Sequence, residues 1–247
     1  MTKVVASIEA RMGSSRLPGK VLADLGGITV LSLLHKRLRQ CRALDGIILA
    51  TSTSSQDDIL EEWARSEEIA IHRGSESDVL QRVVDAHRNM ESDIAVGITG
   101  DCPFMDPEIV DMSVRNFLKN DCDVLSTKGS FPIGQDTVIY KRSILEDNSN
   151  NIFDPLVREH VGYYILQHPE LYRTVTIVAP DCWNYPDHRY TLDYSEDLTF
   201  LRAIYARLFP SAGDFFTFSD ILHIVLNDSR LFDINSMHRT TPGSKGV

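Results

Sequence analysis

Short apolar segments alternate with longer segments of helical periodicity along the first half of the chain. Residues 4–8 form an apolar run typical of a buried strand, whereas Val30, Leu31, Leu34 and Leu38 share one face of a helix predicted over residues 28–41. The alternation predicts right-handed crossovers and a mostly parallel sheet with helices on both faces, an α/β fold. The remaining elements predicted here are strands at residues 46–50, 69–71 and 93–99 and helices at residues 56–66, 79–90 and 107–119.

The second half is less regular. No linker rich in Gly, Pro or Ser separates it from the first half, so we expect one domain over residues 1–239. Residues 240–247 have no apolar pattern and are predicted to form a loose tail. The predicted elements are strands at residues 138–140 and 172–178 and helices at residues 155–167, 196–208 and 218–226.

The net charge of the protein indicates which kinds of binding partner to expect. The 247 residues include 25 Lys and Arg against 35 Asp and Glu, a formal charge of −10. We therefore expect no binding to nucleic acid or to an anionic membrane, because that affinity comes from clustered cations. Yet Lys3, Arg11, Arg16 and Lys20 all lie in the first 20 residues, opposed only by Glu9. This local cluster predicts one anionic ligand rather than an anionic surface.

Cysteine spacing and hydropathy bear on the cellular location. Cys41, Cys102, Cys122 and Cys182 are far apart, without a C-x-x-C pair, so neither a zinc site nor a disulfide framework is predicted. The chain has no apolar run of membrane-spanning length and no apolar stretch of a signal peptide after its charged start. These features predict a reduced, cytoplasmic protein.

The first loop after a strand combines glycines with cations. Residues 13–20 come close to a phosphate-binding P-loop, but five residues separate Gly13 from Gly19 and Val21 follows Lys20, so the motif is not met. Two arginines and a lysine in one pliable loop nevertheless suit a triphosphate, because guanidinium groups grip phosphate oxygens in pairs and ammonium groups act as point charges. The three cations are Arg11, Arg16 and Lys20; the alternative is a solvated basic loop.

Acidic residues follow two other predicted strands. Asp101 comes directly after the strand at residues 93–99, where ligands of an open parallel sheet bind, and a carboxylate there suits Mg²⁺ held partly by substrate phosphates. The alternative for Asp101 is a turn cap, and Asp106 is predicted to cap the helix that begins at Pro107. Asp193 ends a short predicted strand, and Glu196 and Asp197 are expected to start the next helix.

These segments resemble one family. Residues 8–22, which read IEARMGSSRLPGKVL, resemble the opening of the cytidylyltransferases of bacterial surface-sugar synthesis, closest to the SpsF-like branch and related to CMP-octulosonate and CMP-acylneuraminate synthetases. Members often carry glutamine where this chain has Glu9. The resemblance extends from Val4 to about Leu198 and implies a single Rossmann-like nucleotidyltransferase domain, similar to the glycosyltransferase-A fold. It also implies that Asp101 and Asp193 hold Mg²⁺.

The resemblance further implies which residues bind substrates. Ser75 has the alternative of a helix cap, and His160 that of a structural histidine. Asp136, Arg158 and His160 are expected on the acceptor side. The other substrate-binding candidates are Ala10, Gly13, Ser14, Ser52, Arg73, Ser75 and Asp78.

The implied activity is transfer of CMP from CTP to a sugar acid or related surface-polysaccharide precursor, with release of pyrophosphate. Such in-line transfer needs positioning and charge neutralisation rather than a covalent nucleophile. Alternatives are another nucleoside triphosphate, a phosphate or phosphonate acceptor, a non-catalytic nucleotide-binding module, and a nucleotide-sugar glycosyltransferase. The last would need a D-x-D metal motif, matched only by Asp121 to Asp123, which opens a strand. The resemblance also implies a homodimer.

Overall fold

The computed structural model describes residues 2–239, which contain one seven-stranded sheet in the order β3-β2-β1-β4-β6-β5-β7. Strand β6 runs antiparallel to both neighbours, and the other pairs are parallel, so the predicted α/β fold with a mostly parallel sheet is confirmed. The predicted tail at residues 240–247 lies outside the described residues. The strands are β1 (Val4–Glu9), β2 (Gly46–Ser52), β3 (Ala70–Gly74), β4 (Ile94–Thr99), β5 (Val124–Ser126), β6 (Val138–Lys141) and β7 (Thr174–Thr176).

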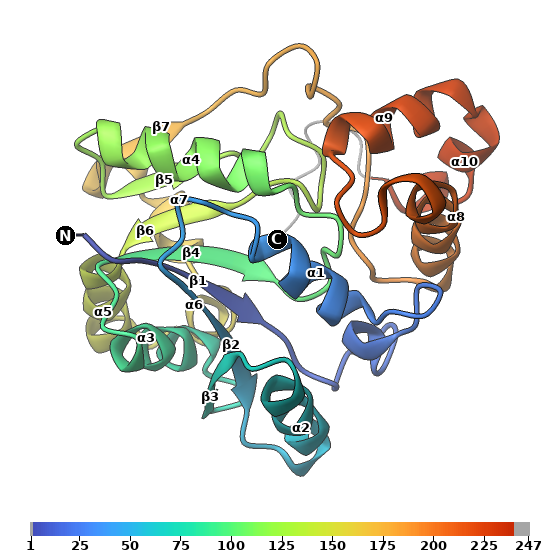
Figure 1. Cartoon of the computed structure of the whole chain (residues 1–247). Coiled ribbons are helices and arrows are strands. Elements are labelled where there is room, and N and C mark those ends of the chain that lie inside the picture. Colours follow the sequence, from blue (N-terminus) through green and yellow to red (C-terminus); the bar gives the residue numbers. More distant parts are fainter. Residues whose placement is uncertain (1, 240–247) are drawn as a thin grey trace.

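Helices cover both faces of the sheet (Figure 1). Alternate residues of β1 explain this arrangement, because Val4, Ala6 and Ile8 pack with α1, α2 and α4 while Val5 packs with α3 and α5. Helices α8 and α9 bury a further core against α1. The helices are α1 (Val30–Leu38), α2 (Asp58–Ser66), α3 (Val79–Asn89), α4 (Pro107–Lys119), α5 (Arg142–Asn151), α6 (Pro155–Glu159), α7 (Tyr163–Gln167), α8 (Ser195–Ala212), α9 (Phe218–Asn227) and α10 (Ser229–Asp233), with 3₁₀ turns η1 (Lys20–Leu22), η2 (Ser55–Asp57), η3 (Pro169–Leu171) and η4 (Ser236–His238).

Two predictions for the second half were wrong. The helix predicted over residues 155–167 is broken into α6 and α7 at Gly162, whose φ of 78° lies in the left-handed region. A Cβ atom there would lie 2.0 Å from the Tyr140 hydroxyl, so glycine permits this close approach. The strand expected to end in Asp193 is absent, and only an isolated bridge joins Arg189 to Ile133.

Within residues 2–239, no helix combines the length and the apolar character needed to cross a membrane.

The structure confirms that Asp106 caps a helix, and the same carboxylate also contacts a second helix and a buried arginine. Its carboxylate accepts hydrogen bonds from the backbone N–H of Glu108 in α4 (2.8 Å) and of Phe218 in α9 (2.5 Å). The guanidinium of Arg37, which is fully buried, lies 3.9 Å from the same carboxylate. Asp106 therefore ties α4 to α9 and neutralises a buried cation.

Replacing Asp106 by asparagine should lower the free energy of unfolding by roughly 3 kcal/mol, because Arg37 would remain buried without its counter-charge. Urea unfolding of the variant measures this loss. In the double variant with Arg37→Met the loss should be smaller than the sum of the single losses, since the pair is removed together. Additive losses would contradict the proposed coupling.

Acid should destabilise the protein through His87. This fully buried side chain of α3 shares a hydrogen bond of 2.9 Å with Ser92, and burial, aided by Arg142, lowers its pKa from 6.5 to about 4. Between those values the unfolded chain binds a proton that the folded chain does not, so stability falls as the pH falls. From pH 7 to pH 5 the expected loss is about 2 kcal/mol.

Urea unfolding at both pH values, with His87→Gln beside the parent protein, isolates this contribution. Between pH 7 and pH 5, the parent protein should lose more stability than the variant, which has no histidine at this position. Identical losses would show that His87 does not carry the effect.

Candidate active site

Two loops at the carboxyl ends of β1 and β4 are brought into contact by a glycine. The backbone N–H of Gly100 donates to the carbonyl oxygen of Glu9 (2.8 Å), and a Cβ atom on Gly100 would lie only 2.8 Å from that of Ala10. The first loop closes on itself through a hydrogen bond from Gly19 N–H to the Met12 carbonyl oxygen (2.9 Å) and then enters η1 at Lys20. Lys20 and Asp101 consequently face each other across the sheet edge.

The Lys20 ammonium lies between two carboxylates from distant parts of the chain. Its Nζ atom is 2.5 Å from Oδ2 of Asp101 and 2.8 Å from Oδ1 of Asp193. Although burial disfavours the charged ammonium, the two carboxylates raise the pKa of Lys20 above its ordinary value. Lys20, predicted to serve a triphosphate, therefore forms one charged cluster with Asp101 and Asp193, predicted to hold a metal. Arg11 lies near Glu76 (3.8 Å) and Glu159 (4.0 Å) instead.

Arginines hold Asp193 from the other side. Arg16 lies 2.6 Å from Oδ1 of Asp193 and Arg189 lies 2.5 Å from Oδ2. Burial opposes ionisation of this carboxyl, but its hydrogen bonds from Lys20, Arg189 and Arg16 keep the pKa well below its usual range. Asp193 is thus an anion at any physiological pH.

Asp197 fixes the backbone that carries Asp193. This fully buried carboxylate accepts from the backbone N–H of Asp193 (2.9 Å) and of Tyr194 (3.1 Å), and it also binds Arg189. It caps the first turn of α8, so the predicted helix-start role of Asp197 is confirmed. Glu196, also predicted there, is in the same first turn and contacts His238.

The donor set suits a divalent cation shared with a substrate. Two carboxylates that bind one ammonium lie within reach of a single cation, and Mg²⁺ commonly takes one or two carboxylates plus phosphate oxygens. Over residues 2–239, no group of three or more His, Cys, Asp or Glu side chains could hold a metal by itself. Asp101 and Asp193 therefore fit a metal that arrives with a phosphate-bearing ligand.

Two adjoining cavities open at this edge of the sheet. The first, about 330 Å³, is lined by the predicted residues Ala10, Arg11, Ser14, Arg16, Lys20 and Asp101; we call it the nucleotide cavity after the ligand that the sequence predicts there. The second, about 410 Å³, is lined by the predicted residues Asp136 and His160 and is called the acceptor cavity after the role predicted for these two residues. Glu9, Thr99, Glu159 and His160 line both. A ligand in one cavity can therefore contact a ligand in the other.

Several predicted site residues lie outside these two cavities. Ser52 is buried and hydrogen-bonded to Asp57, and Arg73 binds the Ser52 carbonyl oxygen (2.9 Å) and Glu61 (2.8 Å). Ser75 accepts from the backbone N–H of Asp78 (3.1 Å) in the turn before α3, but the cap of that helix is Asp78, so Ser75 is not the helix cap considered as its alternative. These contacts hold the turns that follow β2 and β3.

Three more predicted residues lie beside the nucleotide cavity. Asp78 caps α3 through Gln81 N–H (3.0 Å) and forms an ion pair with Arg158. Both line a cavity of about 900 Å³ that also includes Arg11. Gly13 lies nearby, since a Cβ atom there would be 3.4 Å from Oε1 of Glu76.

Sequence reasoning missed Arg82, a cation of the nucleotide cavity. Its side chain is 3% exposed, and its Nε atom has no hydrogen-bond partner among residues 2–239. The sequence does contain a sign of this role, because Arg82 interrupts the apolar face formed by Val79, Val83 and neighbouring residues of α3. An arginine on the buried face of a helix needs an anionic or polar partner.

The other missed residues had no comparable signal in the sequence. Lys128 and Tyr140 line the acceptor cavity, Glu159 lines both cavities, and Arg189 holds Asp193. Lys128 and Arg189 lie in irregular segments, where no periodicity shows the direction of a side chain.

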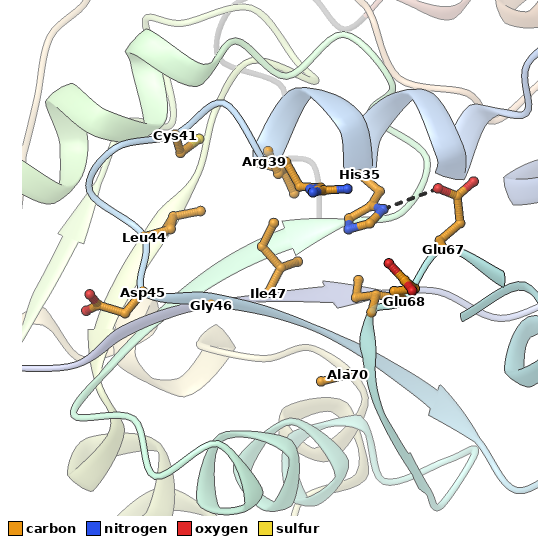
Figure 2. A pocket seen from close by; sticks show the side chains of 12 residues that line it. His35, Arg39, Cys41, Leu44, Asp45, Gly46, Ile47, Glu67, Glu68 and Ala70 are labelled. Atoms are coloured by element: carbon orange, nitrogen blue, oxygen red, sulfur yellow. Dashed lines mark ion pairs between the residues drawn. The ribbon is translucent and has the colours of Figure 1, made fainter. Parts of the chain in front are cut away.

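A polar cavity of about 310 Å³ lies at the opposite edge of the sheet, where β2 and β3 begin (Figure 2). His35 and Glu67 face each other there, with Nδ1 and Oε2 3.6 Å apart. The cavity has none of the predicted site residues in its lining. It therefore has no direct connection to the cluster around Lys20.

The D-x-D segment is also remote from the site. Asp123 immediately precedes β5 and is bound by Lys141 (2.9 Å) and Arg173 (2.8 Å). Since β5 is parallel to β4, its amino end lies at the edge of the sheet opposite Asp101. The placement of this segment does not support the glycosyltransferase alternative.

Known proteins share both the sequence pattern and the fold. A cytidylyltransferase family model matches residues 5–213. The chain is 34% identical over 212 residues to the spore coat polysaccharide biosynthesis protein SpsF of Bacillus subtilis strain 168, covering 84% of this chain and 88% of that protein. A solved cytidylyltransferase from Leptospira borgpetersenii has a TM-score of 0.88 and 27% identity, covering 100% of this chain and 99% of that one.

A more distant structure shares the fold. A CMP:2-keto-3-deoxy-manno-octonic acid synthetase solved with CTP has a TM-score of 0.62 and 19% identity, covering 83% of this chain and 99% of that one. The family model extends across both loops and the start of α8, the segments that supply Lys20, Asp101 and Asp193. The chain belongs to the cytidylyltransferase family, a family of nucleotidyl-transferring enzymes.

Proposed function

We propose that the protein transfers CMP from CTP to a hydroxyl of a sugar acid or a related surface-polysaccharide precursor and releases pyrophosphate. The observation that carries this proposal is the placement of the Lys20 ammonium between Asp101 and Asp193, beside a cavity lined by Arg11, Arg16 and other cations. The names of SpsF and of the octonic acid synthetase support the class of acceptor.

The basic residues of the nucleotide cavity would hold the triphosphate. Arg11, Arg16 and Lys20 can contact its oxygens, and the buried guanidinium of Arg82 adds a positive charge to the wall of the same cavity. Before the nucleotide binds, Lys20 and Arg16 balance the charge of Asp101 and Asp193. Asp101 and Asp193 would hold Mg²⁺, which when bound supplies Lewis-acid polarisation of the α-phosphate.

Transfer then requires the acceptor oxygen to reach the α-phosphorus. A new bond joins the two atoms, the bond from the α-phosphorus to the bridging oxygen of pyrophosphate breaks, and the hydroxyl proton passes to water. The cations stabilise charge on the leaving pyrophosphate. Because Glu9, Thr99, Glu159 and His160 line both cavities, an acceptor in its own cavity can approach a nucleotide in the other.

A panel assay tests the proposal. Purified protein is incubated with each of the four nucleoside triphosphates, Mg²⁺, and either sugar acids or sugar phosphates, and pyrophosphate release is measured. CTP with a sugar acid should exceed the other combinations. Greater release with another nucleoside triphosphate, or only with a phosphate or phosphonate acceptor, would contradict the proposal. Light scattering on the same sample checks the predicted homodimer.

A further inference from the structure

The acceptor cavity lies at the ends of four neighbouring strands, β1, β4, β6 and β5. Glu9 ends β1 beside Thr99 of β4, and a Cβ atom on Gly97 would lie 3.9 Å from Oε1 of Glu9, so the carboxylate lies over this glycine. Thr127 and Thr137 hydrogen-bond to each other beyond β5 and β6. Lys128 and Asp136 are the next residues along these antiparallel segments and both line the cavity.

Two of the three carboxylates that line this cavity, those of Glu9 and Asp136, lack adequate hydrogen-bond partners within the described chain. Over residues 2–239, no group donates a hydrogen bond to the side-chain carboxylate of Glu9, and the Asp136 carboxylate accepts from the backbone N–H of Gly134 (3.0 Å) and from no side chain. Burial raises the pKa of Glu9 to about 7, against the attraction of Arg82 and Lys128, and burial also raises the pKa of Asp136. Both carboxylates would gain from a donor brought by a ligand.

A buried tyrosine gives a second, independent sign of a polar ligand. Tyr140 is 4% exposed, and its hydroxyl has no hydrogen-bond partner among the described residues. Tyr140 lines the acceptor cavity, and its hydroxyl is not among the fully occluded polar atoms that lack a partner. An unpartnered hydroxyl at the wall of a cavity is suited to hydrogen-bond an occupant.

The charge of the cavity is unusual for a site that takes an acid. Besides Glu9 and Asp136 the lining includes Glu159, which lies 4.0 Å from Arg11, and the single ammonium of Lys128. Among residues 2–239, Lys128 forms no direct ion pair, although its charge attracts Glu9 and Asp136, so its ammonium is available to an acceptor carboxylate. A second anionic group on the acceptor would meet the two carboxylates and be repelled.

We propose, on the basis of the function proposed above, that the acceptor is a sugar acid with a protonated amino group, recognised by Glu9 and Asp136 while Lys128 faces its carboxylate. An ammonium group supplies three hydrogen-bond donors and a positive charge, which match carboxylates without partners. Glu9 lines both cavities and Asp136 lines only the acceptor cavity, so an amine within reach of both lies on the acceptor-cavity side of Glu9, away from the reacting hydroxyl.

Three matched acceptors test this proposal. They are 3-deoxy-manno-octulosonate, its analogue with an amino group at the carbon farthest from the reacting one, and the N-acetyl derivative of that analogue. With saturating CTP and Mg²⁺, the parent protein should use the amine with a kcat/KM about tenfold or more above the other two. Glu9→Gln and Asp136→Asn should each remove most of this preference by raising KM for the amine.

Glu62→Gln, on the exposed side of α2, is the matched control and should keep the preference. A parent protein that uses the hydroxyl or N-acetyl acceptor as well as the amine would overturn the inference and leave the proposed function intact. Equal decreases in kcat/KM for all three acceptors in the Glu9 and Asp136 variants would also overturn the inference. Absence of CTP-dependent pyrophosphate release with every sugar acid would overturn the proposed function, and the inference with it.

Discussion

Replacing Lys20 by methionine should lower kcat by roughly two to three orders of magnitude, because its ammonium is positioned both for the phosphates and for two carboxylates. Methionine keeps the length and apolar stem of the side chain but removes the charge. The fold should persist, since Asp193 keeps its ion pairs with Arg16 and Arg189. Pyrophosphate release under saturating substrates measures the loss, and thermal unfolding checks the fold.

A second measurement separates the charge of Lys20 from a structural role. Without the ammonium between them, Asp101 and Asp193 should bind Mn²⁺ more tightly in the absence of nucleotide, even though turnover is lost. Lys119→Met, at an exposed position at the end of α4, is the matched control and should behave like the parent protein. Parent-like turnover in the Lys20 variant would refute the proposed role of this residue.

Replacing Asp101 by asparagine should lower kcat by about 100-fold or more and weaken the dependence on divalent metal. The substitution preserves shape and removes one negative charge from the expected metal site. Asp101 makes its ion pair with Lys20 alone among the described residues, so the free energy of unfolding should change little. Titrating Mg²⁺ in the pyrophosphate assay gives both the maximal rate and the metal concentration at half-maximal rate.

The surface variant Asp181→Asn serves as the control for the loss of one carboxylate. If Asp101→Asn retained the parent rate and the parent Mg²⁺ requirement, Asp101 would be no more than the turn cap considered as its alternative. Asp106→Asn provides a second comparison, because the Asp106 carboxylate contacts α4, α9 and Arg37 and so has a structural role. We expect stability to fall in that variant and activity to fall in the Asp101 variant.

The regular elements around the site were predictable because their signals are local. An apolar run such as residues 4–8 buries both faces of a central strand, and the apolar face of α4 repeats at helical spacing. The family was predicted from the loop at residues 8–22, and the family match confirms it. A prediction was wrong where a tertiary contact overrides the local pattern. At Gly162 the Tyr140 hydroxyl packs against the backbone, and the predicted helix is divided in two.

By itself, the sequence determined the α/β class, the family and the two loops that carry Lys20 and Asp101, because periodicity and motif spacing are properties of short segments. Only the tertiary structure brought Asp193 to Lys20 across more than half of the chain, and only it showed that Arg82 faces the nucleotide cavity while Arg73 binds Glu61. Such contacts depend on how distant segments pack, so the spacing of residues cannot specify them. The same packing leaves Glu9 and Asp136 facing one cavity, where charge rather than motif decides what can bind.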